Sequence, residues 1–298
     1  MERATSCCWT RVNHASRLYG ENEELKAALY IVPTPIGNTG DITLRALETL
    51  KTVDLIAAED TRHSRGLMAQ YDISTPMVSF HEHSEAHVVD QLASRVAAGE
   101  SIALISDAGT PLVSDPGYAL VQGVQNRGGL VIPLPGACAA ITALSAAGLP
   151  THHFHFEGFL PAKRIARVKR LELLKGLGST AILYEAPHRI VDLLTDMQSV
   201  FGAAHEICIA RELTKTFETI RRAPVGEIRE WVLNDSNQQR GEFVVVSAAA
   251  LQSSSLSAEG RALLARLASE LPPRKAAQIV ADHYGLKSRD LYQELISE

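Results

Sequence analysis

The chain has 298 residues, of which 46% are hydrophobic and 21% charged, and its formal net charge is −5. The length suggests two domains, and the composition is that of a globular protein with a sizeable core. The negative charge excludes a uniformly basic nucleic-acid-binding protein, although a local basic patch stays possible. Because no apolar run reaches the ~18 residues that a membrane helix needs, we expect no membrane association.

The four cysteines form neither a CxxC pair nor a zinc-binding pattern; they are Cys7, Cys8, Cys138 and Cys208. We therefore expect a reduced, cytoplasmic protein without a structural metal. Residues 1–28 lack the apolar centre of a signal peptide, and we predict a flexible tail there.

The first half of the chain alternates short apolar runs with helical patterns. The pattern predicts strands at 29–32, 53–60, 101–105 and 130–134, with helices at 43–50 and about 137–147. Strands that alternate with helices indicate βαβ units and a mostly parallel sheet. We assign residues 29–150 to an N-terminal α/β domain.

A second group of elements follows residue 150. Apolar runs predict strands at 180–189, 205–215 and 240–250, which we assign to a second α/β domain over 151–250. After a Ser-rich stretch, residues 257–298 have a helical pattern and predict a small helical module.

Three of the predicted strands in the first half open into loops rich in Gly and Pro. These loops are 33–38, 106–117 and 135–138. In open α/β sheets, ligands bind at the carboxyl ends of strands, where Gly lets the backbone approach them closely. The loops predict a bound small molecule, but none matches the GxxxxGK[ST] or GxGxxG pattern.

Eight motifs occur in a fixed order along the chain. They are "VPTPIGNTGD", "AAEDTR", "SDAGTPLVSDPG", "PLPGACAA", "FEGFLPAK", "YEAPHRI", "ARELTKTFE" and "RGEFVVV". As an ordered set they closely resemble the RsmI family of ribosomal RNA methyltransferases, within the tetrapyrrole methylase superfamily of S-adenosylmethionine (SAM) enzymes. The resemblance covers residues 29–250, and the final helical segment resembles the family's helix-turn-helix module.

The resemblance implies a fold, a cofactor and an assembly. The implied fold is α/β, with two α/β domains of the tetrapyrrole methylase type and a small helical C-terminal module. SAM is expected in the cleft between the two domains, and the implied assembly is a homodimer. The residues implied to contact SAM are Thr110, Val113, Cys138, Ala139, Tyr184 and Ala210, to which the loops add Pro35, Gly37 and Gly109. Thr110 stands where the tetrapyrrole enzymes have an acid.

The implied reaction is methyl transfer to the ribose 2'-oxygen of a decoding-centre cytidine in 16S ribosomal RNA of the small subunit. A ribose hydroxyl is a weak nucleophile until a base removes its proton. Glu185, Glu212 and Asp107 are the candidate bases, since each lies near the end of a predicted strand. For each of them an ion pair or a helix cap is the alternative role.

The segment 161–175 has six basic residues and one acidic residue, Glu172. Phosphate contacts dominate RNA affinity, so this segment predicts an RNA-binding surface. The candidate contacts are Lys163, Arg164, Arg167, Arg189 and Lys215. A solvated helix face is the alternative.

Two other functions fit parts of the sequence. One is a methyltransferase of the same fold that acts on a tetrapyrrole or a protein, against which the basic segment counts. The other is a non-catalytic RNA-binding ribosome-assembly factor, against which the intact cofactor loops count. Histidines with metal-like spacing occur at 81–87 and 152–155, but the resemblance implies no metal.

Overall fold

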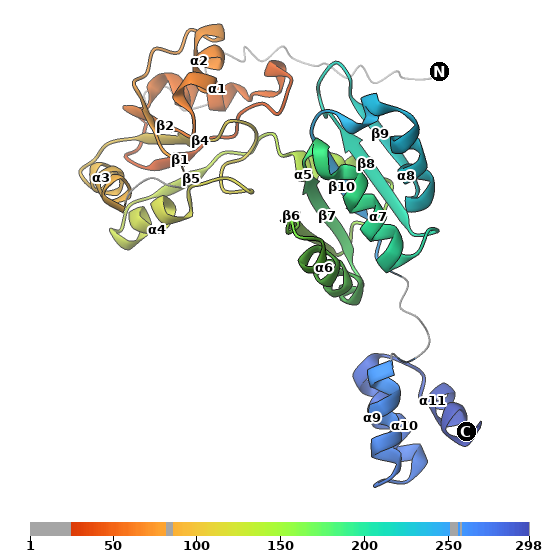
Figure 1. The fold of residues 1–298 in the computed structure, drawn as a ribbon. Helices are drawn as coiled ribbons and strands as arrows, with labels where there is room; N and C mark the ends of the chain where they lie inside the picture. Colours follow the sequence, from red (N-terminus) through yellow and green to blue (C-terminus); the bar gives the residue numbers. More distant parts are fainter. Residues whose placement is uncertain (1–24, 82–85, 251–255, 257, 298) are drawn as a thin grey trace, which may run out of the picture.

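The computed structural model describes residues 25–81, 86–250, 256 and 258–297, so most of the predicted N-terminal tail lies outside the described residues. Within these ranges the chain forms two sheets and a separate group of C-terminal helices (Figure 1). No helix among the described residues is long and apolar enough to cross a membrane.

The first sheet is parallel in every pairing between its described strands, as predicted. Its strand order is β3-β2-β4-β1-β5. The strands are β1 (Leu29–Ile31), β2 (Leu55–Ala58), β3 (Met77–Ser79), β4 (Ile102–Ile105) and β5 (Val131–Pro133). The central strands β2 and β4 are buried along their whole length, which explains their unbroken apolar runs.

Two pairs of helices cover the two faces of the first sheet (Figure 1). Residues of α1 (Leu44–Thr52) and α2 (Thr61–Gln70) join one apolar cluster with the sheet. Residues of α3 (Ala86–Ala97) and α4 (Tyr118–Asn126) join the other. The carboxyl ends of the strands stay open between these layers, where the predicted loops lie.

The second sheet is mixed, which the sequence patterns did not predict. Its order is β6-β7-β10-β8-β9, and only β6 and β7 pair in parallel among its described strands. The strands are β6 (Phe154–Phe159), β7 (Thr180–Glu185), β8 (Glu206–Arg211), β9 (Thr219–Pro224) and β10 (Phe243–Ser247). A buried apolar run looks the same in either direction, so its sequence does not reveal which neighbour it pairs with.

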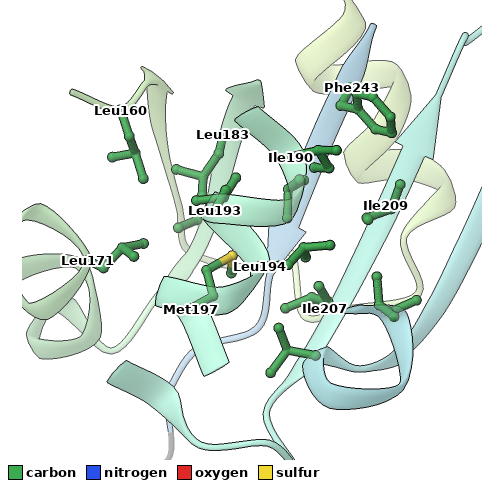
Figure 2. Packing of buried hydrophobic residues seen from close by; sticks show 14 of the residues in the cluster. Leu160, Leu171, Leu183, Ile190, Leu193, Leu194, Met197, Ile207, Ile209 and Phe243 are labelled. Atoms are coloured by element: carbon green, nitrogen blue, oxygen red, sulfur yellow. The ribbon is translucent and has the colours of Figure 1, made fainter. Parts of the chain in front are cut away.

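One face of the second sheet carries three helices, α6 (Arg164–Leu177), α7 (Ile190–Phe201) and α8 (Val225–Asn234). Figure 2 shows Leu171 of α6 and Leu193 and Met197 of α7 in one apolar cluster with sheet residues such as Leu183 and Ile207. Burial of such side chains contributes ~1.5–3 kcal/mol each before the entropy cost of folding is subtracted.

The other face of the second sheet is covered by α5 (Ala139–Ala146). The sequence pattern assigns this segment to the N-terminal domain, but Ala140, Ala143 and Leu144 pack against Ile182 and Val244 of the second sheet. The backbone N–H of Ala140 also donates to the Tyr184 hydroxyl at 3.1 Å. Helix α5 therefore holds the β5 loop of the first sheet against the second.

The C-terminal helices have their own apolar core. They are α9 (Ala258–Ala268), α10 (Pro273–Tyr284) and α11 (Ser288–Ser297). Leu264, Ala277, Val280 and Leu291 pack together in this core. Helix α10 ends at Tyr284 and is capped by Gly285, whose φ of 65° lets the chain turn sharply towards α11.

Candidate cofactor cavity and active site

The loops after β1, β4 and β5 converge, as the sequence predicted. Thr34 and Gly109 form a two-way backbone pair, with N···O distances of 2.9 and 3.0 Å. The Thr110 hydroxyl then donates to the Ala137 carbonyl at 2.8 Å. The three loops are thus joined by hydrogen bonds into one rim.

Gly109 is required for this rim because its φ is +84° and a Cβ there would lie 3.2 Å from Cγ2 of Ile36. Further along the same loop, Leu112 and Ser114 have φ values of 72° and 68°. Non-glycine residues in this region are strained, and such strain clusters at functional sites.

A cavity of about 320 Å³, here called the first cavity, opens beside this rim. Its size is that of a small-molecule site. Seven of the residues predicted to contact the cofactor line it: Gly109, Thr110, Val113, Cys138, Ala139, Tyr184 and Ala210. These residues come from both α/β halves of the chain, so tertiary structure brings them together.

A second cavity of about 490 Å³ lies next to the first, and the two share Ile36, Ala108 and Glu242. Pro35 and Gly37, also predicted to contact the cofactor, line this second cavity and not the first. Gly37 packs against the loop after β8, since a Cβ there would lie 2.5 Å from Cγ of Lys215. Its role in the structure is to let these two loops meet.

Glu185 lines the first cavity, but its side chain is completely buried. Its Oε1 lies 3.0 Å from Nε of Arg189 and accepts a hydrogen bond from the Ala186 N–H at 2.9 Å. Burial raises the pKa of Glu185, against the opposing effects of that N–H and of Arg189. This environment suits a structural ion pair better than proton transfer.

Glu212, another predicted base, lies away from both cavities, and its role as base stays a prediction. It lines neither cavity, and its Oε1 is held by Nζ of Lys215 at 3.0 Å and by the Glu242 N–H at 2.9 Å. Burial pushes the pKa of Glu212 up, but these hydrogen bonds outweigh it and leave the pKa lowered. Its Oε1 therefore already accepts from two donors.

Asp107 lines the second cavity and not the first. Its Oδ1 accepts a hydrogen bond from the Asp60 N–H at 3.1 Å, and its own N–H donates to Glu59 at 3.3 Å. Asp107 therefore joins the loop after β4 to the loop after β2.

Asp115 is the residue that sequence reasoning missed. It lines the first cavity on the turn that precedes α4 and is partly exposed. The pKa of Asp115 is raised to about 6, chiefly by burial, and the negative charges of Glu59 and Asp107 also raise it. A hydrogen bond with Ser106 acts in the opposite direction. The motif "SDPG" by itself indicates only a turn before a helix, and no local pattern shows that its acid faces a ligand cavity.

Three of the predicted RNA contacts are engaged inside the protein. Arg167 is only 3% exposed and pairs with Asp196 at 2.8 Å, so its guanidinium is engaged inside the protein and its predicted RNA contact gains no support. Arg189 donates to the Leu160 carbonyl at 2.6 Å, and Lys215 lies between Glu212 and Glu242. The charge run on α6 thus combines a solvated face with a buried ion pair.

Lys163 and Arg164 remain exposed at the start of α6. The side chain of Arg164 is 72% exposed even though its Nε donates to Asp196 at 2.9 Å. Over the described ranges, no group of three or more His, Cys, Asp or Glu side chains could hold a metal ion. His83 lies outside those ranges.

Comparison with known proteins shows which family the chain belongs to. The family of tetrapyrrole (corrin/porphyrin) methylases matches residues 28–229, and the RsmI C-terminal HTH domain matches residues 254–298. The chain is 51% identical to the ribosomal RNA small subunit methyltransferase I of Pseudomonas aeruginosa over 271 aligned residues. The alignment covers 90% of this chain and 96% of that protein. The chain belongs to the RsmI branch of the tetrapyrrole methylase family.

Other relatives agree with this membership. The ribosomal RNA small subunit methyltransferase I of Escherichia coli O157:H7 is 49% identical over 91% of this chain and 95% of its own. Among solved structures, diphthine synthase has a TM-score of 0.58 at 13% identity, over 74% of this chain and 90% of its own. Cobalt precorrin-4 methyltransferase has a TM-score of 0.54 at 17% identity, over 76% and 96%. At these identities the two structures show a shared fold.

Members of the tetrapyrrole methylase family use SAM as methyl donor, and the first cavity suits that molecule. Its wall includes small residues at Gly109, Ala139 and Ala210, which leave room for a ligand. Ile36 and Val244 add apolar surface for an adenine ring. The cavity therefore combines a mostly apolar wall with a few polar side chains, among them Thr110 and Tyr184, as small-molecule sites generally do.

Proposed function

We propose that the protein transfers a methyl group from SAM to the ribose 2'-oxygen of a decoding-centre cytidine in 16S ribosomal RNA. The observation that carries the proposal is the agreement of two independent features. The nearly full-length relatives are named ribosomal RNA small subunit methyltransferases, and this chain has both a cavity of suitable size and an exposed basic helix start.

In this proposal SAM occupies the first cavity. Gly109, Thr110 and Val113 contact it from the β4 loop, Cys138 and Ala139 from the start of α5, and Tyr184 and Ala210 from the second sheet. When bound, SAM supplies an electrophilic methyl group on a sulfonium sulfur. The rim hydrogen bond from Thr110 to Ala137 keeps the loops in place, so that the acceptor oxygen is oriented before reaction.

Asp115 acts as the general base. Three carboxylates line the first cavity, but Glu185 is completely buried and Glu242 pairs with Lys215 at 2.9 Å. Asp115 is partly exposed, and burial and neighbouring negative charges raise its pKa. Its carboxylate would accept the proton of the 2'-hydroxyl as the oxygen bonds to the methyl carbon and the carbon–sulfur bond of SAM breaks, which leaves a neutral thioether. This role suits a pKa near the working pH.

The exposed start of α6 contacts RNA phosphates. Lys163 and Arg164 lie there, and Lys169 is exposed further along the helix. We also propose, from the resemblance to the family, that the protein is a cytoplasmic homodimer whose substrate is the small ribosomal subunit.

The test is methyl transfer from labelled SAM to small ribosomal subunits isolated from cells that lack the protein. We expect 2'-O-methylcytidine, identified by mass spectrometry of the digested RNA. A Thr110→Trp variant, which fills the first cavity, should neither bind SAM nor transfer methyl. Binding of SAM without any transfer to RNA would contradict the proposal and favour a tetrapyrrole or protein substrate; no SAM binding by the wild type would favour a non-catalytic assembly factor.

A further inference from the structure

Strand β6 has a bulge at its end that changes the direction of one side chain. Its register with β7 shifts between Phe156 and Gly158, and Gly158 has a φ of +70°. In a regular strand, residues three apart point to opposite faces of the sheet. Here Phe156 and Phe159 both contact the ring of Tyr184, at centroid distances of 5.1 and 5.7 Å. The bulge therefore turns Phe159 to the same side as Phe156.

This direction brings Phe159 to the first cavity, which it lines together with Tyr184. The residue nevertheless stays 55% exposed. Its edge-to-face contact with Tyr184 supports the ring from within the protein. A large, supported aromatic ring at a cavity mouth is available to a flat ligand.

Phe159 also lies beside the turn that contains the proposed base. A Cβ on Gly158 would lie 3.1 Å from the Ser114 hydroxyl oxygen, so β6 and the β4 loop are in close contact here. Asp115 follows Ser114 and lines the same cavity. An aromatic ring and a carboxylate thus border one opening.

Two basic residues follow Phe159 closely in the sequence. Lys163 and Arg164 come shortly after Phe159 and are exposed at the start of α6. The guanidinium of Arg164 stays accessible from solvent, because its side chain is 72% exposed beside Asp196. An exposed aromatic ring and exposed basic side chains thus lie within six residues of each other in the sequence. Stacking rings and basic groups are the two components of single-stranded RNA recognition.

We propose that Phe159 is the stacking platform for the unpaired base of the acceptor nucleotide. This inference rests on the proposed function. Single-stranded RNA is typically recognised with its bases splayed out, so the base of the nucleotide whose 2'-oxygen reaches Asp115 needs a new stacking partner. Aromatic side chains provide such a partner for splayed-out RNA bases, and the phosphates that flank the base meet Lys163 and Arg164.

The test compares Phe159→Ala, Phe159→Tyr and Phe154→Ala. Phe154 is the matched control because it lies on the same strand and is 45% exposed but does not line the first cavity. For each protein, methyl transfer is measured against the concentration of small subunits, and SAM affinity is measured by calorimetry. The wild type must first methylate the RNA; if it does not, the proposed function fails and not this inference alone.

We expect Phe159→Ala to lower kcat/KM for the RNA about tenfold or more, as removal of a stacking partner does. SAM affinity should change less than about twofold, Phe159→Tyr should retain the rate, and Phe154→Ala should behave as the wild type. Unchanged kcat/KM in Phe159→Ala would overturn the inference. An equal loss of SAM affinity would also overturn it, because the ring would then only support Tyr184. A change of oligomeric state would overturn it too, because the ring would then contact a second copy.

Discussion

At the scale of single residues, the site depends on a loop held in an unfavourable backbone conformation. Leu112 and Ser114 both have positive φ, which costs of order 1–3 kcal/mol each. The fixed turn holds Asp115 at the first cavity, near the negative charges of Glu59 and Asp107. The same conformation that destabilises the loop therefore raises the proton affinity of its carboxylate.

The raised pKa of Asp115 predicts the pH dependence of the reaction. Only the deprotonated carboxylate accepts a proton, so kcat/KM should rise as the pH increases through about 6. Asp115→Asn should lower the rate by about 10²- to 10⁴-fold with little change in SAM affinity. The measurement is a pH–rate profile of methyl transfer to small subunits.

Asp107→Asn is the control for that profile. Because the charge of Asp107 helps to raise the pKa of Asp115, its removal should shift the inflection to lower pH. A wild-type profile without an inflection in the acid range would contradict the assignment of Asp115 as base.

At the scale of elements, a buried ion pair joins α6 to α7. Asp196 of α7 is buried and accepts hydrogen bonds from Nε of Arg164 at 2.9 Å and Nε of Arg167 at 2.8 Å. Arg167 also donates to the Ala162 carbonyl at 3.3 Å. Because this carbonyl precedes α6, the pair helps to fix where the exposed basic helix start lies.

Loss of Asp196 should destabilise the protein strongly. Asp196→Ala would leave the Arg167 charge buried without its partner, and we expect the free energy of unfolding to fall by about 3–5 kcal/mol. Asp192→Ala is the matched control, since Asp192 is 71% exposed and lies 3.9 Å from the same guanidinium; its effect should be at most ~1 kcal/mol. Urea unfolding measures both, and equal effects would refute the importance of the buried pair.

At the scale of the whole molecule, a net charge of −5 opposes RNA binding, so a local surface must provide the attraction. The start of α6 is the surface that we propose. The C-terminal helices have a separate core, and none of their described residues lines either cavity. Their charge is balanced, with six basic and six acidic residues from Ser257 to Glu298.

A double charge reversal distinguishes local attraction from total charge. Lys163→Glu with Lys169→Glu should weaken RNA binding and make it less salt-dependent. The slope of log K against log salt should become smaller by about 0.7–0.9 for each phosphate that the variant no longer neutralises. SAM affinity should not change.

The control for this variant is Lys51→Glu with Arg65→Glu, at exposed positions on α1 and α2. This pair alters the net charge equally and should have a much smaller effect on RNA binding. Equal weakening by both pairs would exclude the α6 surface.

The sequence by itself determined the features that depend on neighbouring residues. Apolar runs such as 53–60 and 101–105 predicted buried strands, and the Gly and Pro of residues 106–117 predicted the loop at the end of β4. Strand burial and turn formation are local properties, because side-chain alternation and φ preferences act within a few residues. The ordered motifs also identified the family. Most of the predicted cofactor contacts that line the first cavity came from the same motifs.

Only the tertiary structure decided the features that depend on distant partners. It placed α5 on the second sheet, made three of the strand pairings there antiparallel, and buried Arg167 against an aspartate 29 residues away. It also partly buried Asp115 and brought it near Glu59 and Asp107, and these two effects raise its pKa. Burial and charge interactions depend on distance in space, and a pattern along the chain does not contain that distance.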